Sequence, residues 1–175
     1  NNHEGDVHLA EEMIREAAAC GADAVKFQTI VPEELVSAAD RNRVKQLKRF
    51  QFSFAQFEKL ADAAGECGLI FLSTPFDLEG VHFLNRLVPA IKISSGDNTF
   101  YPLLKAVAET EKPVLLSSGL ADIDTLRTSK GVIEKVWSDR DVMPGLVVLH
   151  CVGAYPVPAE DANLAAIPFI SRELD

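Results

Sequence analysis

Short apolar runs alternate with amphipathic helical stretches along this 175-residue chain, and no other feature constrains its fold as strongly. We predict strands at these runs, which are residues 22–29, 69–76, 90–95, 113–119 and 145–151. The runs are continuously apolar, which is typical of parallel strands that helices cover on both faces. Repeated strand–helix units of this kind predict right-handed βαβ crossovers and therefore an α/β fold.

Glycine and serine mark the ends of the predicted helices. The first helix stops at Gly21, and the second begins at Ser53 as its N-cap and ends at Gly68. Further helices are predicted over residues 78–87, 101–110 and 122–137, and a final helix is predicted within residues 159–174. The stretch 29–52 is longer than a typical connection and contains the basic cluster "RNRVKQLKR". We expect a short helix or a mobile active-site loop there, with a solvated charged face as the alternative.

Composition excludes several classes of partner. The formal net charge is −9, which argues against nucleic acid and against an anionic membrane surface. No apolar stretch approaches the roughly 20 residues that cross a bilayer. The three cysteines, Cys20, Cys67 and Cys151, are far apart and odd in number, which predicts buried free thiols in a reducing, cytoplasmic compartment.

Polar residues follow the apolar part of each predicted strand. The clusters are Lys26 to Thr29, Ser73 to Phe76, Ser94 to Asp97, Ser117 to Gly119 and His150 to Pro156. In folds built from βα units the carboxyl ends of parallel strands meet on one face, where ligands bind. Hydroxyls, backbone N–H groups and two lysines in such a ring suit phosphate or carboxylate oxygens.

Lys26 and Lys92 each interrupt a strand that otherwise reads as core. Lysine is seldom fully buried without a partner. We therefore expect both amines to point into the mouth of a barrel and to pair with the negative charge of a ligand. The alternative is that each lysine reaches solvent past a strand end or pairs with a core carboxylate such as Asp97.

The chain resembles the sialic acid synthase family through six segments that occur in the family's order. They are "NHEGD", "GADAVKFQT", "LSTPFD", "AIKISSGD", "KPVLLSSGL" and "LHCVGAYPVPAEDANL". Enzymes of this family condense phosphoenolpyruvate with N-acetylmannosamine or a related aminosugar. The resemblance implies a (β/α)8 TIM barrel, a divalent metal (Mn²⁺ or Mg²⁺) and a homodimer in the full-length enzyme.

The resemblance also implies roles for individual residues. Glu4 matches the acidic catalytic residue of the N-terminal motif. Phosphoenolpyruvate-binding positions are matched by Lys26, Thr74, Lys92, Ser95 and Ser117. Sugar-contacting positions are matched by Gln28 and Tyr155, and Asp97 stands where a glutamate is more common. Gly153 stands where asparagine or serine is frequent, so one polar contact to the ligand is lost or supplied by water.

We expect residues 1–175 to be a partial TIM-barrel catalytic domain. In the family, the first barrel strand would precede Asn1, while the last strands, the metal-binding histidines and a C-terminal antifreeze-like domain would follow Asp175. No metal ligand is therefore expected within this chain. Two other functions stay open from the residues alone. One is a Schiff-base aldolase that uses Lys92 or Lys26 as nucleophile, and the other is a non-catalytic phosphosugar-binding protein.

Overall fold

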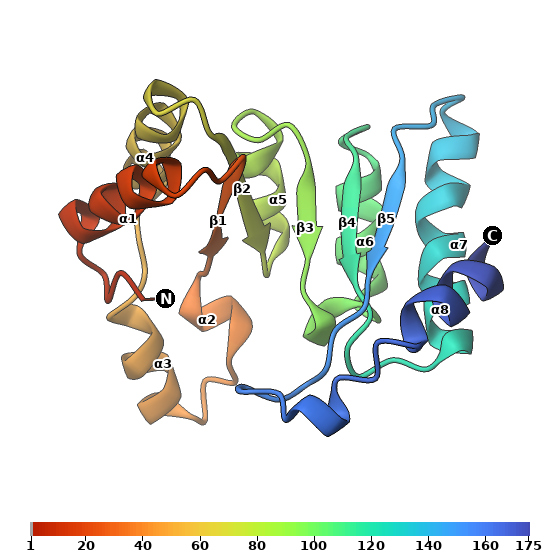
Figure 1. Ribbon diagram of the computed structural model, residues 1–175. Helices are drawn as coiled ribbons and strands as arrows, with labels where there is room; N and C mark the ends of the chain where they lie inside the picture. The colour runs from red at the N-terminus through yellow and green to blue at the C-terminus, as the bar shows by residue number, and fades with distance from the viewer. Residues whose placement is uncertain (1) are drawn as a thin grey trace. The chain divides into compact units, whose positions relative to one another are not determined.

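The computed structural model describes residues 2–175, which divide into two compact units, Asn1–Ile91 and Lys92–Asp175. Each unit is an α/β arrangement in which helices alternate with strands (Figure 1). Both contain parallel strands, since β1 pairs with β2 and β4 pairs with β5 in parallel register. The α/β fold and the parallel pairing expected from the sequence are therefore confirmed.

The first unit is built around a two-stranded sheet. In chain order its elements are α1 (Val7–Ala19), β1 (Ala24–Thr29), α2 (Pro32–Leu35), α3 (Arg41–Lys48), α4 (Phe54–Glu66), β2 (Ile70–Pro75) and α5 (Leu78–Asn85). Helices α1 and α4 pack side by side (Figure 1). The register places Lys26 opposite Leu72 and Gln28 opposite Thr74, so the polar ends of the two strands lie together.

Local capping explains where the helices of this unit begin. The Ser53 hydroxyl accepts a hydrogen bond from the Gln56 backbone at 3.3 Å, and the Gln56 side chain accepts one from the Ser53 backbone at 2.8 Å. This reciprocal capping box satisfies two backbone donors that a helix start would leave unpaired. Gly21 and Gly68 follow α1 and α4 at φ +82° and +74°, a left-handed conformation that favours glycine. The predicted N-cap and both predicted stops are confirmed.

Aromatic and aliphatic side chains form the core of the first unit. Phe54 and Phe83 stack with ring centroids 4.1 Å apart, and Phe57 lies within 6.3 Å of Phe83. On α1, Ala10 and Ile14 are buried, but Leu9 and Met13 are 37% and 39% exposed. The apolar face of α1 is therefore only partly covered within the described residues.

The second unit begins within β3 and carries a three-stranded sheet in the order β3-β4-β5. Its elements are β3 (Ile91–Ile93), the 3₁₀ turn η1 (Ser95–Asp97), α6 (Tyr101–Ala108), β4 (Val114–Ser117), α7 (Ile123–Asp139), β5 (Leu146–Leu149), η2 (Ala159–Asp161) and α8 (Ala166–Leu174). Helix α7 packs on α6, and the Trp137 indole donates a hydrogen bond to the Ala108 carbonyl at 3.1 Å.

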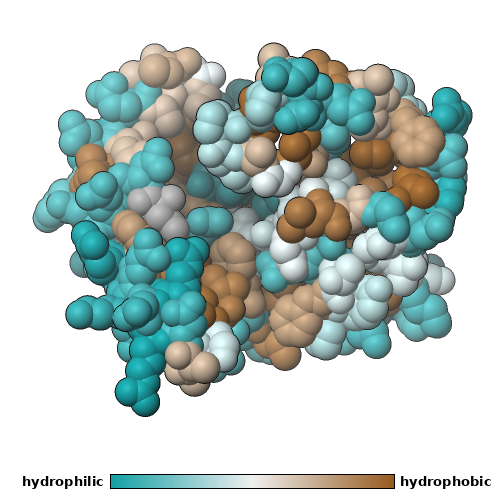
Figure 2. All heavy atoms as spheres, turned by 90° about the horizontal axis from the view of Figure 1, so that it is seen from below, coloured by the Kyte–Doolittle hydropathy of each residue, from teal (hydrophilic) through white to brown (hydrophobic). Residues whose placement is uncertain are grey.

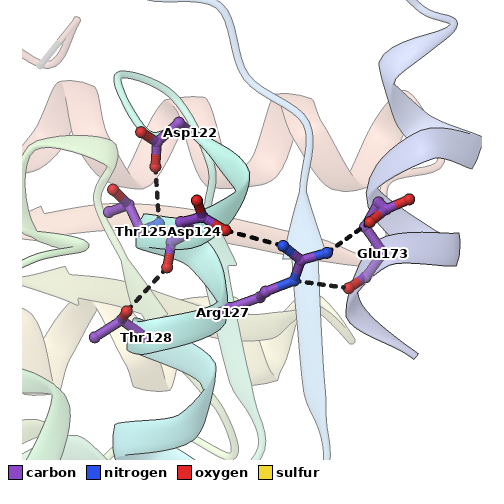
Figure 3. Close-up of polar contacts among 6 residues, drawn as sticks. All are labelled: Asp122, Asp124, Thr125, Arg127, Thr128 and Glu173. Atoms are coloured by element: carbon purple, nitrogen blue, oxygen red, sulfur yellow. Dashed lines mark hydrogen bonds and ion pairs between the residues drawn. The ribbon is translucent and has the colours of Figure 1, made fainter.

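Polar contacts attach α8 to α7 (Figure 3). The Asp122 carboxylate caps α7 by accepting from the Thr125 backbone at 2.8 Å. The Arg127 guanidinium bridges Asp124 at 2.9 Å and Glu173 of α8 at 2.5 Å. One arginine therefore pairs with its own helix and with the next, which holds α8 against α7.

The structure refines two predictions about helices. The final helix predicted within residues 159–174 is α8, which begins only at Ala166, because Asn163 adopts a left-handed φ of +43° between η2 and α8. A residue in that conformation cannot continue a right-handed helix. The stretch 29–52 contains two short helices, α2 and α3, rather than one short helix or a loop.

The cysteines are free, as expected, but they are not all buried. Cys20 is exposed, while Cys67 and Cys151 are half-buried. Cys20 is the C-cap residue of α1, where the helix turns out toward solvent. None of the helices that residues 2–175 form is long and apolar enough to cross a membrane.

Candidate active site

Lys92 lies in the middle of β3 and is only 8% exposed. Its amine donates one hydrogen bond to the carbonyl of Ile93 at 2.7 Å and another to the Ser117 hydroxyl at the end of β4. The lysine therefore does not run out to solvent, which was one of the two alternatives for its position. A buried ammonium group requires hydrogen-bond partners of this kind, because desolvating a charge is costly.

The Ser117 hydroxyl is a shared acceptor. It receives the Lys92 amine on one side and the Cys151 thiol at 3.3 Å on the other. A serine oxygen accepts two hydrogen bonds and donates one. With both acceptor positions used, the hydroxyl hydrogen of Ser117 is available to donate to an anionic ligand.

Ser95 approaches the backbone of Gly119 closely. A Cβ atom placed on Gly119 would lie 2.7 Å from the Ser95 hydroxyl oxygen and 3.1 Å from its Cβ atom. It would also lie 3.4 Å from the Cβ atom of Cys151. A side chain here would have to displace Ser95, and glycine avoids that contact in a turn where residue 119 is itself buried. The sequence shows a glycine after two serines here, but no periodic pattern reveals the close contact.

Asp97 stands at the end of η1 with one oxygen buried and unpaired. Its Oδ2 atom has no hydrogen-bond partner among the described residues. Burial raises the pKa of this carboxyl above its ordinary value, because desolvation disfavours the charged form. An acceptor in this condition is suited to a hydroxyl or amide N–H of a substrate.

Figure 2 looks onto the ends of the strands, where apolar side chains lie at the surface among polar ones. In the second unit, Leu120 follows β4 and is 84% exposed, and Tyr155 follows β5 and is 98% exposed. The structure therefore brings Lys92, Ser95 and Ser117 together around Gly119, but it does not bring Tyr155 into this cluster.

In the first unit, the polar ends of β1 and β2 form a second group. The hydroxyls of Thr29 and Ser73 hydrogen-bond at 2.8 Å and join the two strand ends. Thr74 is buried at 2% exposure opposite Gln28. Much of the Lys26 side chain is exposed, yet partial burial lowers the pKa of its amine.

The N-terminal motif lies beside β1. His3 is buried and stacks on Phe52 at 4.3 Å, and its Nδ1 atom accepts a hydrogen bond from the Gly5 backbone at 3.1 Å. Burial lowers the pKa of this imidazole, so the neutral form is favoured. Asn1, which precedes the motif, lies outside the described residues.

A pocket of about 360 Å³ lies between this motif, α1 and β1, and its lining includes His3, Lys26 and Gln28. Glu4 is exposed at a left-handed φ of +51° and is not part of that lining. The structure therefore groups Lys26 and Gln28 with the N-terminal loop through His3, while the carboxylate of Glu4 faces solvent. His3 was not singled out in the sequence, although its place between two amides and a carboxylate marks it as polar.

A metal centre is not evident within residues 2–175. No group of three or more histidine, cysteine, aspartate or glutamate side chains in this part of the chain is arranged to hold a metal ion. The side chains present do not fit a resident metal, so no chemical step is assigned to one here. Ligands outside this chain stay a prediction.

Comparisons with known proteins show which family and which solved structures the chain is similar to. The model of the NeuB family matches residues 13–175. N,N'-diacetyllegionaminic acid synthase of Campylobacter jejuni is 34% identical over 180 residues, covering 95% of this chain and 53% of that protein. The uncharacterized protein MJ1065 of Methanocaldococcus jannaschii is 44% identical over 167 residues, covering 95% of this chain and 48% of that protein.

A solved structure is similar as well. The N-acetylneuraminic acid (sialic acid) synthetase of Leptospira borgpetersenii, crystallised with citrate, superposes with a TM-score of 0.90 at 34% identity. The match covers 98% of this chain and 58% of that one. The chain thus spans about half the length of the curated relatives it matches.

Substituting Gly119 tests the close packing around Ser95. Because the added methyl group would lie 2.7 Å from the Ser95 oxygen, we expect Gly119→Ala to lower the free energy of unfolding by roughly 1–3 kcal/mol. Gly131 on α7 is the matched control, since a Cβ atom there meets nothing within 4 Å. Gly131→Ala should stabilise the helix by about 0.5–1 kcal/mol. Denaturant unfolding measures the free energy of unfolding of both variants. An equal change in the two would contradict the close packing of Ser95 on Gly119.

Substituting Asp97 tests how much its buried carboxylate lowers the stability of the folded protein. The pKa of the Asp97 carboxyl is higher in the folded state than in the unfolded state, where it is about 3.9. Ionisation therefore destabilises the folded state as the pH rises from the unfolded-state pKa through the folded-state pKa. We expect Asp97→Asn to raise the Tm by roughly 2–5 °C at pH 7. This gain should vanish below about pH 4, where the carboxyl is protonated in both states. Thermal unfolding from pH 3 to 8 measures it, with Asp62→Asn on the exposed side of α4 as control. A constant gain at all pH values would refute the assignment.

Proposed function

The chain belongs to the NeuB family, the family of sialic acid synthases, and from that membership we propose that its protein condenses phosphoenolpyruvate with an N-acetylated aminosugar. The product is a nine-carbon 2-keto-3-deoxy sugar acid, and inorganic phosphate is released. The protein is then a transferase. N-acetylmannosamine and diacetamido sugars are the candidate acceptors, since similar proteins make N-acetylneuraminic and diacetyllegionaminic acids.

The observation that carries this proposal is the buried pair of Lys92 and Ser117. Phosphoenolpyruvate bears a carboxylate and a phosphate, and charge-assisted hydrogen bonds to such groups are the strong ones. Lys92 supplies a buried amine held by Ser117, Ser117 supplies a hydroxyl hydrogen, and Gly119 lets Ser95 approach the turn after β4. These features favour an anionic ligand over a neutral one.

The remaining binding roles follow the family resemblance. Ser95 joins Lys92 and Ser117 as a donor to phosphoenolpyruvate, and Lys26 and Thr74 bind the same substrate. Asp97 and Gln28 contact the sugar, as does Tyr155. Asp97 accepts a hydrogen bond from a sugar hydroxyl or amide, which satisfies the oxygen that is unpaired in the described residues. Glu4 orients the sugar or transfers a proton.

The proposed chemistry forms one C–C bond and breaks one C–O bond. Carbon 3 of phosphoenolpyruvate attacks the open-chain aldehyde of the sugar, and the aldehyde oxygen takes up a proton. Water adds at carbon 2 and loses a proton there. The resulting tetrahedral intermediate expels phosphate with its bridging oxygen, and the hydroxyl proton at carbon 2 passes to the leaving phosphate, which leaves a ketone at carbon 2. The residues of this chain hold the two charged groups of phosphoenolpyruvate so that carbon 3 faces the aldehyde.

We further propose that the strands of both units belong to a (β/α)8 barrel and that the complete enzyme is a homodimer. The strand–helix alternation and the similarity to the Leptospira synthetase support the barrel. Dependence on Mn²⁺ or Mg²⁺ is proposed for the same enzyme, with ligands outside this chain.

A Schiff-base aldolase is the second candidate, and Lys26 is the observation that favours it. Partial burial lowers the pKa of the Lys26 amine, and a neutral amine is the form that attacks a carbonyl. Such an enzyme would form a covalent imine and would release no phosphate.

The test of function incubates the protein at its natural length with phosphoenolpyruvate, each candidate sugar and Mn²⁺ or Mg²⁺. Phosphate release that depends on both substrates would support the synthase. Borohydride trapping of a pyruvate adduct on Lys26 without phosphate release would support the aldolase. Binding of phosphoenolpyruvate with neither reaction would instead indicate a non-catalytic binding protein.

Replacing Lys92 should weaken phosphoenolpyruvate binding selectively. Loss of one charge-assisted contact costs about 1.5–3 kcal/mol, so Lys92→Ala should raise the KM for phosphoenolpyruvate roughly 10- to 150-fold. The KM for the sugar should change little. Lys105→Ala on the exposed side of α6 is the control. A raised KM for the sugar alone, with that for phosphoenolpyruvate unchanged, would overturn the role of Lys92.

Replacing Glu4 should have the opposite pattern. If its carboxylate moves a proton or orients the sugar, Glu4→Gln should lower kcat by roughly 10²-fold or more and leave the KM for phosphoenolpyruvate nearly intact. Glu66→Gln, at the exposed end of α4, is the control. Steady-state kinetics decide the point, and a Glu4→Gln protein with near wild-type turnover would mean that the motif is structural.

A further inference from the structure

Asn98 is a buried amide that connects the ends of two strands. It follows η1 directly, is 3% exposed, and donates from Nδ2 to the carbonyls of Gly119 at 3.0 Å and Ser117 at 3.4 Å. The Ser117 carbonyl belongs to the last residue of β4 and the Gly119 carbonyl to the turn after it, whereas Asn98 belongs to the segment after β3. One side chain therefore joins the two strand ends that carry Lys92 and Ser117.

The chemistry of this bridge requires a neutral amide. Both partners are carbonyl oxygens, so the NH₂ group must face them, and it supplies the two hydrogens that two acceptors need. A carboxylate of the same shape would place negative charge against the same oxygens. Aspartate is therefore the sharpest substitution here, since it keeps the volume and removes both donors.

A second contact fixes Asn98 from the side of the helices. The hydroxyl of Ser129, on α7 and fully buried, donates to the Asn98 carbonyl at 2.5 Å and lies 2.9 Å from the Thr125 carbonyl. The backbone of Asn98 is thus tied to α7 while its side chain is tied to β4. Because Asn98 is hydrogen-bonded to both α7 and the end of β4, it fixes the distance between the elements that it joins.

That spacing determines how Ser95 meets Gly119. The approach of the Ser95 hydroxyl to this glycine leaves no room for a methyl group, so a small shift of the β3 segment would change it. We propose that Asn98 is a positioning residue that sets the distance between Ser95 and the Ser117–Gly119 turn, and thereby shapes the anion site. This inference rests on the proposed function, in which that site takes phosphoenolpyruvate. Asn98 itself contacts no substrate.

The test compares Asn98→Asp with wild type and with Asn85→Asp, an exposed amide on α5, in the protein at its natural length. We expect Asn98→Asp to raise the KM for phosphoenolpyruvate about tenfold, the loss expected for one hydrogen bond to a charged group. The KM for the sugar should stay within twofold. If Asn98 only stabilised the fold, its substitution would lower the amount of active protein but would not change the KM for phosphoenolpyruvate relative to that for the sugar. Equal changes in both, or none, would overturn the proposal.

Two further measurements keep the test decisive. If Asn98→Asp does not fold, Ser129→Ala takes its place, with an expected rise of about threefold in the same KM and none for the sugar. If wild type releases no phosphate from phosphoenolpyruvate, the proposed function fails, and calorimetry with inorganic phosphate then tests the positioning role alone. Weaker phosphate binding by the variant would support that role, and equal binding by both proteins would overturn it.

Discussion

The burial of one ammonium group, that of Lys92, is the constraint on which the second unit depends. A charged lysine inside a strand is stable only if its hydrogens find acceptors, and Ile93 and Ser117 provide two of them. This requirement fixes the position of β4 beside β3, because Ser117, the last residue of β4, must lie within hydrogen-bond distance of the Lys92 amine. It also places the Lys92 amine beside the Ser117 hydroxyl at the end of β4. An anionic substrate is the ligand that such an arrangement favours.

Close packing between the turn after β4 and the segment after β3 gives the site around Lys92 its shape. Gly119 allows the turn after β4 to approach Ser95, and Asn98 joins the same turn to the segment after β3. Because Ser129 ties Asn98 to α7, the geometry of the site is coupled to the helical layer of its unit. Asp97 adds a buried oxygen without a partner among the described residues, at a cost in stability that substrate binding would relieve. The Asp97 carboxyl therefore lowers the stability of the protein without substrate and, in the proposed function, contributes to substrate binding.

Much of the fold and part of the site could be predicted from the sequence. Apolar runs and capping residues such as Ser53 depend on local preferences, so the strands and most helix ends follow from them. Polar residues at strand ends identified Lys92, Ser95 and Ser117, because parallel strands bring their carboxyl ends together. Contacts between distant residues could not be predicted in this way. The left-handed Asn163 that separates η2 from α8, the amide bridge of Asn98 and the exposure of Cys20 all depend on tertiary surroundings.

We propose that the group around Lys92 and Ser117 binds phosphoenolpyruvate. A crystal structure of the protein at its natural length, soaked with phosphoenolpyruvate, would show whether it does. We expect carboxylate or phosphate oxygens of the ligand to lie within hydrogen-bond distance, about 2.7–3.2 Å, of the Lys92 amine and the Ser117 hydroxyl. A ligand bound elsewhere, with the contacts of Lys92 to Ile93 and Ser117 unchanged and no ligand oxygen near them, would contradict it.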